Sequence, residues 1–413
     1  MSSRKLYTSI VILILFVTIF FLKQNFLGEL YQDENHYLPT AVFFSKEPVP
    51  SLDLLKSYNE LNTPVPFILG GWTVSVFGEN IQCLRLLTYA VSFVLLMTFV
   101  WSSPDNSKRF FLCLAGLMIF PNYYLCSVYY YTDIFAMLGV LAGTVAYLRK
   151  THWWGMLFFI AAVSSRQYML AFPAAIVAYE FLELLKKDFS IPKFISGLFK
   201  DLTWLPYALA VLSILPWVLL WKGPAPAAVM ADQYYDSDKL IQYNFGYVIY
   251  SSACLAIYYV IPEILITKKL RYFIEYPKTH PGFFITFLVL IAALITLFPA
   301  KQAYNPYFTW PYLGYVDQLL MTIGITGFIK QVVFGLLMLI TLMRFISPGF
   351  NLAGCVVVIN ILLLGKAQLS WDKYSLPMIM VLWFLAMFDY HWPFSVSDNQ
   401  SEKLLHNQNP VRG

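Results

Sequence analysis

Long apolar segments recur along almost the whole chain, and short polar segments separate them. An apolar segment of about 20 residues is long enough to cross a membrane as a helix. The pattern predicts an all-α polytopic membrane protein in which 1–390 form a single transmembrane domain and 391–413 form a polar cytosolic tail. About twelve transmembrane helices are expected, at 6–22, 82–101, 109–126, 132–148, 153–164, 168–184, 203–221, 245–266, 281–298, 325–345, 351–365 and 375–390.

One apolar segment, 63–77, differs from the others because prolines and the Gly70-Gly71 pair interrupt it. A helix of about 15 residues reaches only about 22 Å, whereas the hydrocarbon core of a membrane is about 30 Å thick. We therefore expect a re-entrant or interfacial helix here. It would lie inside a long first external loop, 23–80.

The basic residues support this topology. They occur as pairs at four short loops: Lys108-Arg109, Arg149-Lys150, Lys186-Lys187 and Lys268-Lys269. Loops rich in lysine and arginine lie on the cytosolic side of a membrane. All four pairs are cytosolic if the N-terminus is inside and 63–77 does not span. The polar residues of the loop 23–80 then face the opposite side.

Composition agrees with a membrane protein, because 59% of the residues are apolar and only 12% are charged. A typical soluble domain is about 25% charged. The five cysteines include no CxxC pair, so we expect small buried apolar side chains rather than a metal site. The sequence contains no phosphate-binding glycine loop and no dinucleotide, serine-hydrolase or zinc-protease motif. No cofactor, metal or nucleic-acid partner is predicted.

Asp33 and Glu34 follow the first predicted transmembrane helix. Two adjacent carboxylates are too costly for a membrane interior, so we expect them at its external, water-facing mouth. A reaction at a hydroxyl group needs a base that removes the proton, and either carboxylate can serve as that catalytic group. The same residues also fit a helix start, in which Asp33 caps a helix that runs over 35–44.

Four further candidates for substrate binding lie at external loop tips of the predicted topology. Two of them are Tyr131 and Asp133, although Asp133 also fits the N-cap of the following helix. Arg166 and Gln167 lie between two apolar segments that almost no loop separates. A guanidinium there suits a phosphate or a carboxylate, although an arginine at this depth also snorkels to lipid headgroups.

The last external loop offers Trp371 and Lys373. Lys373 can hold a leaving phosphate, although the same residues also fit a solvated loop with an interfacial tryptophan. His36, beside the two acids, is a candidate titratable group, and equally a structural histidine.

Several short segments resemble a known family, the dolichyl-phosphate-glucose-dependent α-1,2-glucosyltransferases of lipid-linked oligosaccharide assembly. In chain order, the segments that resemble that family are Asp33-Glu34, Pro39, Asn62-Thr63-Pro64, Leu84-Arg85, Phe120-Pro121, Tyr130-Tyr131-Thr132-Asp133 and Arg166-Gln167. They cover about 30–170 of the chain. Two details depart from the family: Tyr37 stands in place of its histidine, and Val65 separates its two adjacent prolines.

The resemblance implies the GT-C type of membrane glycosyltransferase fold. It implies an inverting hexosyltransferase that moves glucose or another hexose from a polyprenyl-phosphate donor, such as dolichyl phosphate glucose, to a hydroxyl of a glycan or lipid-linked acceptor. Asp33 would be the base, with Glu34 next in line, and Asp133 would position the acceptor. The active site would lie on the luminal or periplasmic face of an endoplasmic reticulum or bacterial inner membrane. A transporter or flippase of a lipid-linked glycan is the alternative, but such proteins concentrate polar groups near the membrane midplane.

Overall fold

The computed structural model describes residues 3–23, 26–187, 190–231, 243–298, 312–346, 350–367 and 370–388, and the predicted tail 391–413 lies outside them. The helices of the first half are α1 (Ser3–Leu22), α2 (Glu34–Phe44), α3 (Leu52–Ser57), α4 (Val65–Phe77), α5 (Ile81–Ser102), α6 (Phe110–Met118), α7 (Pro121–Val128), α8 (Asp133–Leu148), α9 (His152–Val163), η2 (Gln167–Leu170), α10 (Ala171–Lys187) and α11 (Ile191–Lys200). Those of the second half are η3 (Leu202–Trp204), α12 (Leu205–Leu212), α13 (Leu215–Trp221), α14 (Ala227–Ala231), α16 (Phe245–Leu255), η4 (Ala256–Val260), α17 (Ile261–Thr267), α18 (Leu270–Thr279), α19 (Pro281–Leu297), α20 (Tyr315–Thr322), α21 (Gly327–Phe345), α22 (Leu352–Leu364), η5 (Asp372–Ser375) and α23 (Leu376–Ala386).

This architecture confirms the predicted all-α class. In the described ranges the strands are two short segments, β1 (Tyr312–Leu313) and β2 (Ser370–Trp371), which pair in parallel with Tyr312 opposite Ser370. They join the segment before α20 to the segment before η5.

The lengths and composition of the helices also support a multi-span membrane protein. Among the described residues, six helices are long and apolar enough to cross a membrane, or eight if each of two bent helix pairs forms one span. Four further apolar helices (α4, α8, α9 and α22) are shorter than a full span. The larger count of about twelve spans stays a prediction. The predicted helix within 63–77 is α4, and its 13 residues make it too short to cross a membrane alone.

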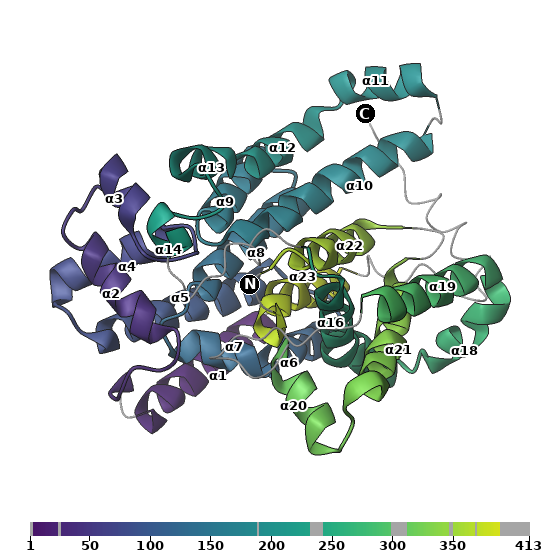
Figure 1. Ribbon diagram of the computed structural model, residues 1–413, viewed down its shortest axis with the longest axis horizontal. Helices are drawn as coiled ribbons and strands as arrows, with labels where there is room; N and C mark the ends of the chain where they lie inside the picture. Colours follow the sequence, from purple (N-terminus) through teal and green to yellow (C-terminus); the bar gives the residue numbers. More distant parts are fainter. Residues whose placement is uncertain are drawn as a thin grey trace.

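A central helix, α23, organises the core. All of its residues from Leu376 to Ala386 are buried, as expected of a helix that is apolar on every side. It packs against α6, α8 and α22, so helices from both halves of the chain surround it (Figure 1). The segment that leads into α23 is therefore held firmly at one end of the bundle.

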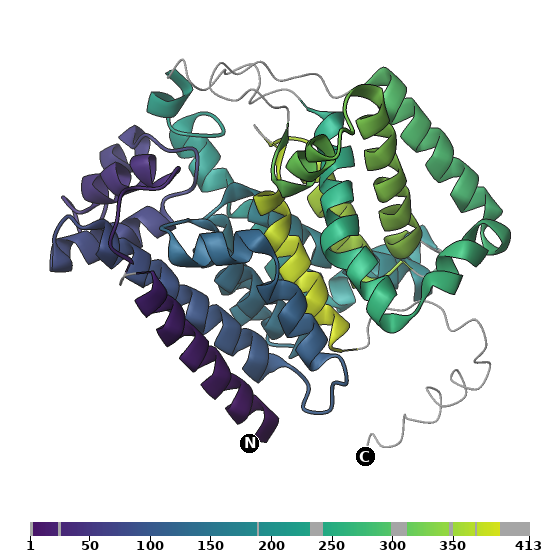
Figure 2. The ribbon, with the colours of Figure 1, turned by 90° about the horizontal axis from the view of Figure 1, so that it is seen from below.

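The chain between α1 and α5, which the sequence predicts to be external, forms the compact unit α2–α4 at one end of the molecule, opposite to the N-terminus of α1 (Figure 2). α2 packs directly on α4. The contact needs a small residue, because a Cβ atom at Gly71 would lie 2.7 Å from the backbone carbonyl carbon of Phe44. The Gly70-Gly71 pair thus allows the two helices to approach closely.

We predict that Gly71→Ala lowers the melting temperature of the detergent-solubilised protein. The added methyl group forces apart a well-packed contact, which costs about 1–3 kcal/mol. The matched control is Gly282→Ala in α19, where an added Cβ meets no atom within 4 Å. Equal melting temperatures of the two variants would contradict this prediction, because they would show that α2 and α4 can move apart without a loss of stability.

Candidate active site

Asp33 lies in the turn that connects the end of α1 to α2. Gln32, just before it, has a left-handed backbone with φ 45°, a conformation that non-glycine residues rarely adopt. Asp33 then occupies the N-cap position of α2, but its side chain makes no capping hydrogen bond. The cap alternative therefore does not account for this carboxylate, which points to other partners.

The first partner is Lys373, from the far end of the chain. Its Nζ lies 2.9 Å from Oδ2 of Asp33 and 3.9 Å from Oδ2 of Asp133. The lysine side chain is 1% exposed, and its ammonium lies over the rings of Trp371 (4.2 Å) and Tyr131 (4.3 Å). Because η5 leads directly into the buried helix α23, the position of this ammonium is fixed by the core.

Asp133 and Arg166 form a second ion pair beside that of Asp33 and Lys373. Their closest nitrogen and oxygen atoms are 3.1 Å apart, and both side chains are buried. Arg166 Nε donates a hydrogen bond to Thr132 Oγ1, and the Tyr168 hydroxyl donates one to Asp133 Oδ1. Since no side chain caps the N-terminus of α8, Asp133 is used here for the ion pair and not as a cap.

Tyr37 connects the two ion pairs. Its hydroxyl accepts hydrogen bonds from Asn62 Nδ2 (3.1 Å) and Arg166 Nη2 (3.5 Å), and it donates one to Asp33 Oδ2 (3.4 Å). The cluster thus joins α2, the loop before α4, the starts of α8 and η2, and η5. We call Asp33, Asp133, Arg166 and Lys373 the charge cluster.

Exposure separates Asp33 from the other members of the charge cluster. Its side chain is 30% exposed, whereas those of Lys373 and Asp133 are 1% and 0% exposed. Burial alone would raise the pKa of Asp33, but Lys373 and then Arg166 outweigh it and lower that pKa. Asp33 is therefore an ionised carboxylate that a ligand can reach.

Glu34 has a different environment, although it is adjacent in sequence. It is fully buried and forms a bidentate ion pair with Arg85, at 2.9 and 2.5 Å. The backbone N–H groups of Tyr31 and Tyr130 donate further hydrogen bonds to the same carboxylate, each at 2.8 Å. These bonds tie the segment between α1 and α2 to α5 and to the segment before α8.

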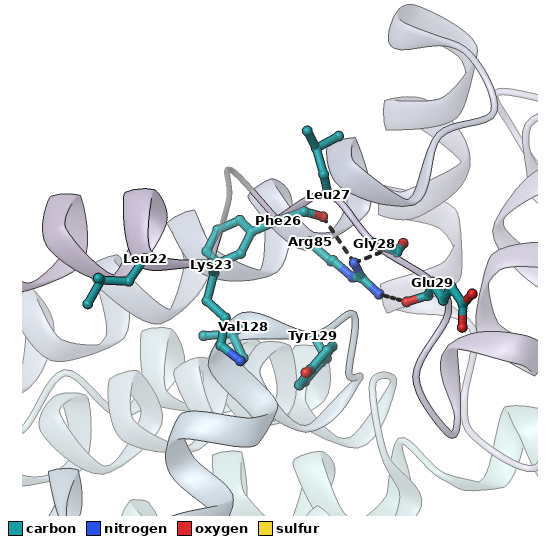
Figure 3. Close-up of a pocket in the computed structure, with 9 residues that line it drawn as sticks. All are labelled: Leu22, Lys23, Phe26, Leu27, Gly28, Glu29, Arg85, Val128 and Tyr129. Carbon is teal, nitrogen blue, oxygen red and sulfur yellow. Dashed lines mark hydrogen bonds between the residues drawn. The ribbon is translucent and has the colours of Figure 1, made fainter.

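A pocket with a cavity volume of about 290 Å³ opens beside this ion pair, at the end of α1 (Figure 3). Arg85 lines it but donates its remaining N–H groups to the carbonyl oxygens of Phe26, Gly28 and Glu29. All five N–H groups of the guanidinium are therefore used within the protein. Arg85 holds the loop in place and has no donor left for a bound anion.

Glu60 is another buried carboxyl group near the charge cluster, and it is not among the site residues that the sequence predicts. Its residue is 3% exposed, and Oε1 has no hydrogen-bond partner in the described part of the chain. Burial and the nearby charge of Asp33 raise its pKa to about 8. The sequence signal was its position two residues before Asn62-Thr63-Pro64, a segment that already resembled a glycosyltransferase loop.

The remaining predicted site residues lie around this cluster. Gln167 donates from Nε2 to the carbonyl oxygen of Leu61, and Tyr131 donates to Gln32 Oε1. His36 is exposed on α2 and its charge acts on Asp33. Tyr37, Tyr168 and Arg85 were not selected, because a buried tyrosine or arginine cannot be told from a snorkelling one in a sequence.

In the described ranges, no three His, Cys, Asp or Glu side chains gather where they could hold a metal ion. Four of the five cysteines are buried, as expected of small apolar side chains, and none of the five forms a disulfide bond. Comparison of the chain with protein families, curated proteins and solved structures gave no match.

We predict that Arg85→Met strongly destabilises the protein, because it leaves the Glu34 carboxylate buried without its counter-charge. Breaking a buried ion pair by removing one partner costs about 3–5 kcal/mol. The control is Arg271→Met, in which an 83% exposed arginine loses its ion pair with Glu275. Thermal melting should show a large decrease for Arg85→Met and none for Arg271→Met, and equal melting would contradict the structural role of Arg85.

We also predict a pH dependence of stability that Glu60 causes. A carboxyl group whose pKa rises from 4.5 to about 8 on folding stabilises the fold fully at low pH. That stability is lost as the pH rises from 4.5 through 8, at up to about 1.4 kcal/mol per pH unit. Melting temperatures of the wild type should fall over this pH range, whereas those of Glu60→Gln should fall less. If the melting temperatures of both proteins fell equally with pH, Glu60 would not be the cause of the pH dependence.

Proposed function

We propose that the protein is a membrane-integral glycosyltransferase of GT-C type. It transfers glucose or another hexose from a polyprenyl-phosphate donor to a hydroxyl of a glycan or lipid-linked acceptor, with inversion. The reaction takes place on the luminal or periplasmic face of an endoplasmic reticulum or bacterial inner membrane. Membrane lipids surround the helices, and the lipid tail of the donor lies among them.

One observation carries this proposal. The reachable carboxylate of Asp33 forms an ion pair with a buried ammonium, Lys373, within a charge cluster at one end of an apolar helical bundle. This arrangement supplies a base next to cationic groups, at a place where the sugar-phosphate headgroup of a lipid-borne donor can bind. The family resemblance of the segments around Asp33, Asp133 and Arg166 points to the same chemistry.

In the proposed reaction, the acceptor hydroxyl approaches Asp33 from the external side. Its oxygen forms a bond to the anomeric carbon while the bond from that carbon to the phosphate oxygen breaks. The hydroxyl proton moves to Asp33. The electron pair of the broken bond stays on the leaving lipid phosphate.

The charge cluster couples the two halves of this step. Asp33 and Asp133 are the acidic partners of Lys373 and Arg166 in this cluster. When Asp33 takes the proton, the cluster gains one positive charge. The leaving phosphate gains one negative charge in the same step, so Lys373 is released to stabilise it.

The other predicted residues have positioning roles in this scheme. Asp133 orients Lys373 and Arg166 through the contacts described above. Trp371 and Tyr131 hold the ammonium over their rings, and Gln167 and His36 border the approach to Asp33. Asp33 is favoured over Glu34 as the base, because the Glu34 carboxylate already accepts hydrogen bonds from Arg85 and two backbone N–H groups.

We predict that Asp33→Asn reduces sugar transfer by about 10²–10⁴-fold, the usual contribution of a general base. The control is Asp53→Asn, which alters an exposed aspartate of the same external loop. Transfer is measured with purified protein in nanodiscs, polyprenyl-phosphate hexoses and glycan acceptors, with mass detection of the product. Full activity of Asp33→Asn would assign the base to another residue.

The same assay separates a transferase from a flippase. A transferase releases free polyprenyl phosphate in proportion to the product. A flippase moves the intact donor between leaflets and releases none, and a panel of hexose donors without any release would refute the proposal.

A further inference from the structure

The segment 58–62, between α3 and α4, is bonded to residues beside the charge cluster through Leu61 and Asn62. The Tyr58 hydroxyl donates to the carbonyl oxygen of Asn62 at 2.7 Å and so closes the turn. Asn62 Nδ2 donates to the Tyr37 hydroxyl, and Gln167 Nε2 donates to the carbonyl oxygen of Leu61. Leu61 and Asn62, directly after Glu60, are thus bonded to Gln167 and to Tyr37, and the Tyr37 hydroxyl donates in turn to Asp33.

Within this well-bonded turn, one oxygen of the Glu60 side chain is the exception. The carboxyl group is buried and has a backbone hydrogen bond with Leu61, yet its Oε1 has no partner among the described residues. A buried polar atom without a hydrogen bond destabilises a fold by the lost hydration of that atom. Such an atom next to a candidate active site is explained if a ligand supplies the missing partner.

The surroundings of Glu60 favour a neutral carboxyl group. The titratable and charged groups that interact electrostatically with Glu60 are Asp33 just before α2, Tyr37 on α2, Tyr58 in its own turn, Tyr130 before α8, and Arg166 before η2. Arg166, the one cation among them, is already paired with Asp133. A neutral carboxyl group can both donate and accept a hydrogen bond, as a sugar hydroxyl does.

We propose that Glu60 is a ligand-binding residue whose carboxyl group exchanges hydrogen bonds with a hydroxyl of the sugar or glycan that occupies this site. The identity of the ligand class rests on the proposed function. In this arrangement the two acids have different roles, because Asp33 accepts the proton and Glu60 orients the carbohydrate. Glu60 selects for a hydroxyl at one position, because a ligand without it leaves the buried carboxyl unpaired.

Two substitutions of Glu60 test the proposal in the full-length protein in nanodiscs. Glu60→Met keeps the size but removes both oxygens, and Glu60→Gln keeps a neutral donor and acceptor. We expect Glu60→Met to raise the melting temperature without ligand, because it removes an unpaired buried polar group. It should also lower transfer by about 10- to 100-fold, whereas Glu60→Gln stays close to the wild type.

Binding is measured separately, as the melting-temperature shift that methyl α-D-glucopyranoside or methyl α-D-mannopyranoside causes at tens of millimolar. We expect a shift in the wild type and in Glu60→Gln, and none in Glu60→Met. The proposal fails if the wild type shows no shift, or if Glu60→Met shows the wild-type shift. It also fails if Glu60→Gln is as inactive as Glu60→Met, because the carboxyl would then act as an ionised base.

The two readouts distinguish this inference from the proposed function. A hexoside shift that depends on Glu60, in a protein that cleaves none of the donors, supports carbohydrate binding and refutes the transferase. Donor cleavage without any hexoside shift refutes the role of Glu60 and leaves the transferase standing.

Discussion

The arrangement of the candidate site depends on one buried positive charge, the ammonium of Lys373. A charge removed from water is tolerated only when opposite charges and hydrogen bonds compensate it. Asp33 and Asp133 supply that compensation from two loops that are distant in sequence from the lysine. The requirement fixes the segment before α2, the start of α8 and the entry to α23 relative to one another.

The neighbouring ion pair of Glu34 and Arg85 performs a structural task with similar chemistry. Its carboxylate and guanidinium are satisfied entirely by protein groups, whereas Asp33 keeps an exposed face. Two adjacent acids therefore have opposite uses: one anchors the loop to α5, and the other faces the space outside. The rigidity that Glu34 provides is what allows Asp33 to be held next to Lys373 without being enclosed.

The sequence predicted the helical membrane class and selected Asp33, Asp133, Arg166 and Lys373, because charged residues beside apolar segments are costly and therefore informative. It could not decide between capping and ion pairing, since that depends on where each side chain points. The pairing of Lys373 with Asp33 joins residues 340 positions apart, which no local pattern encodes. The same holds for Glu60, whose burial follows from how its turn packs against α2 and η2.

The two carboxyl groups near the cluster, Asp33 and Glu60, are driven in opposite directions by their surroundings. Cations lower the pKa of the first, while burial raises that of the second to about 8. Asp33 also contributes to the difference, since its negative charge makes ionisation of Glu60 harder. A pair of acids held in different protonation states at neutral pH can accept a proton at one position and donate a hydrogen bond at the other. That combination suits a carbohydrate, whose hydroxyl groups need both kinds of partner at once.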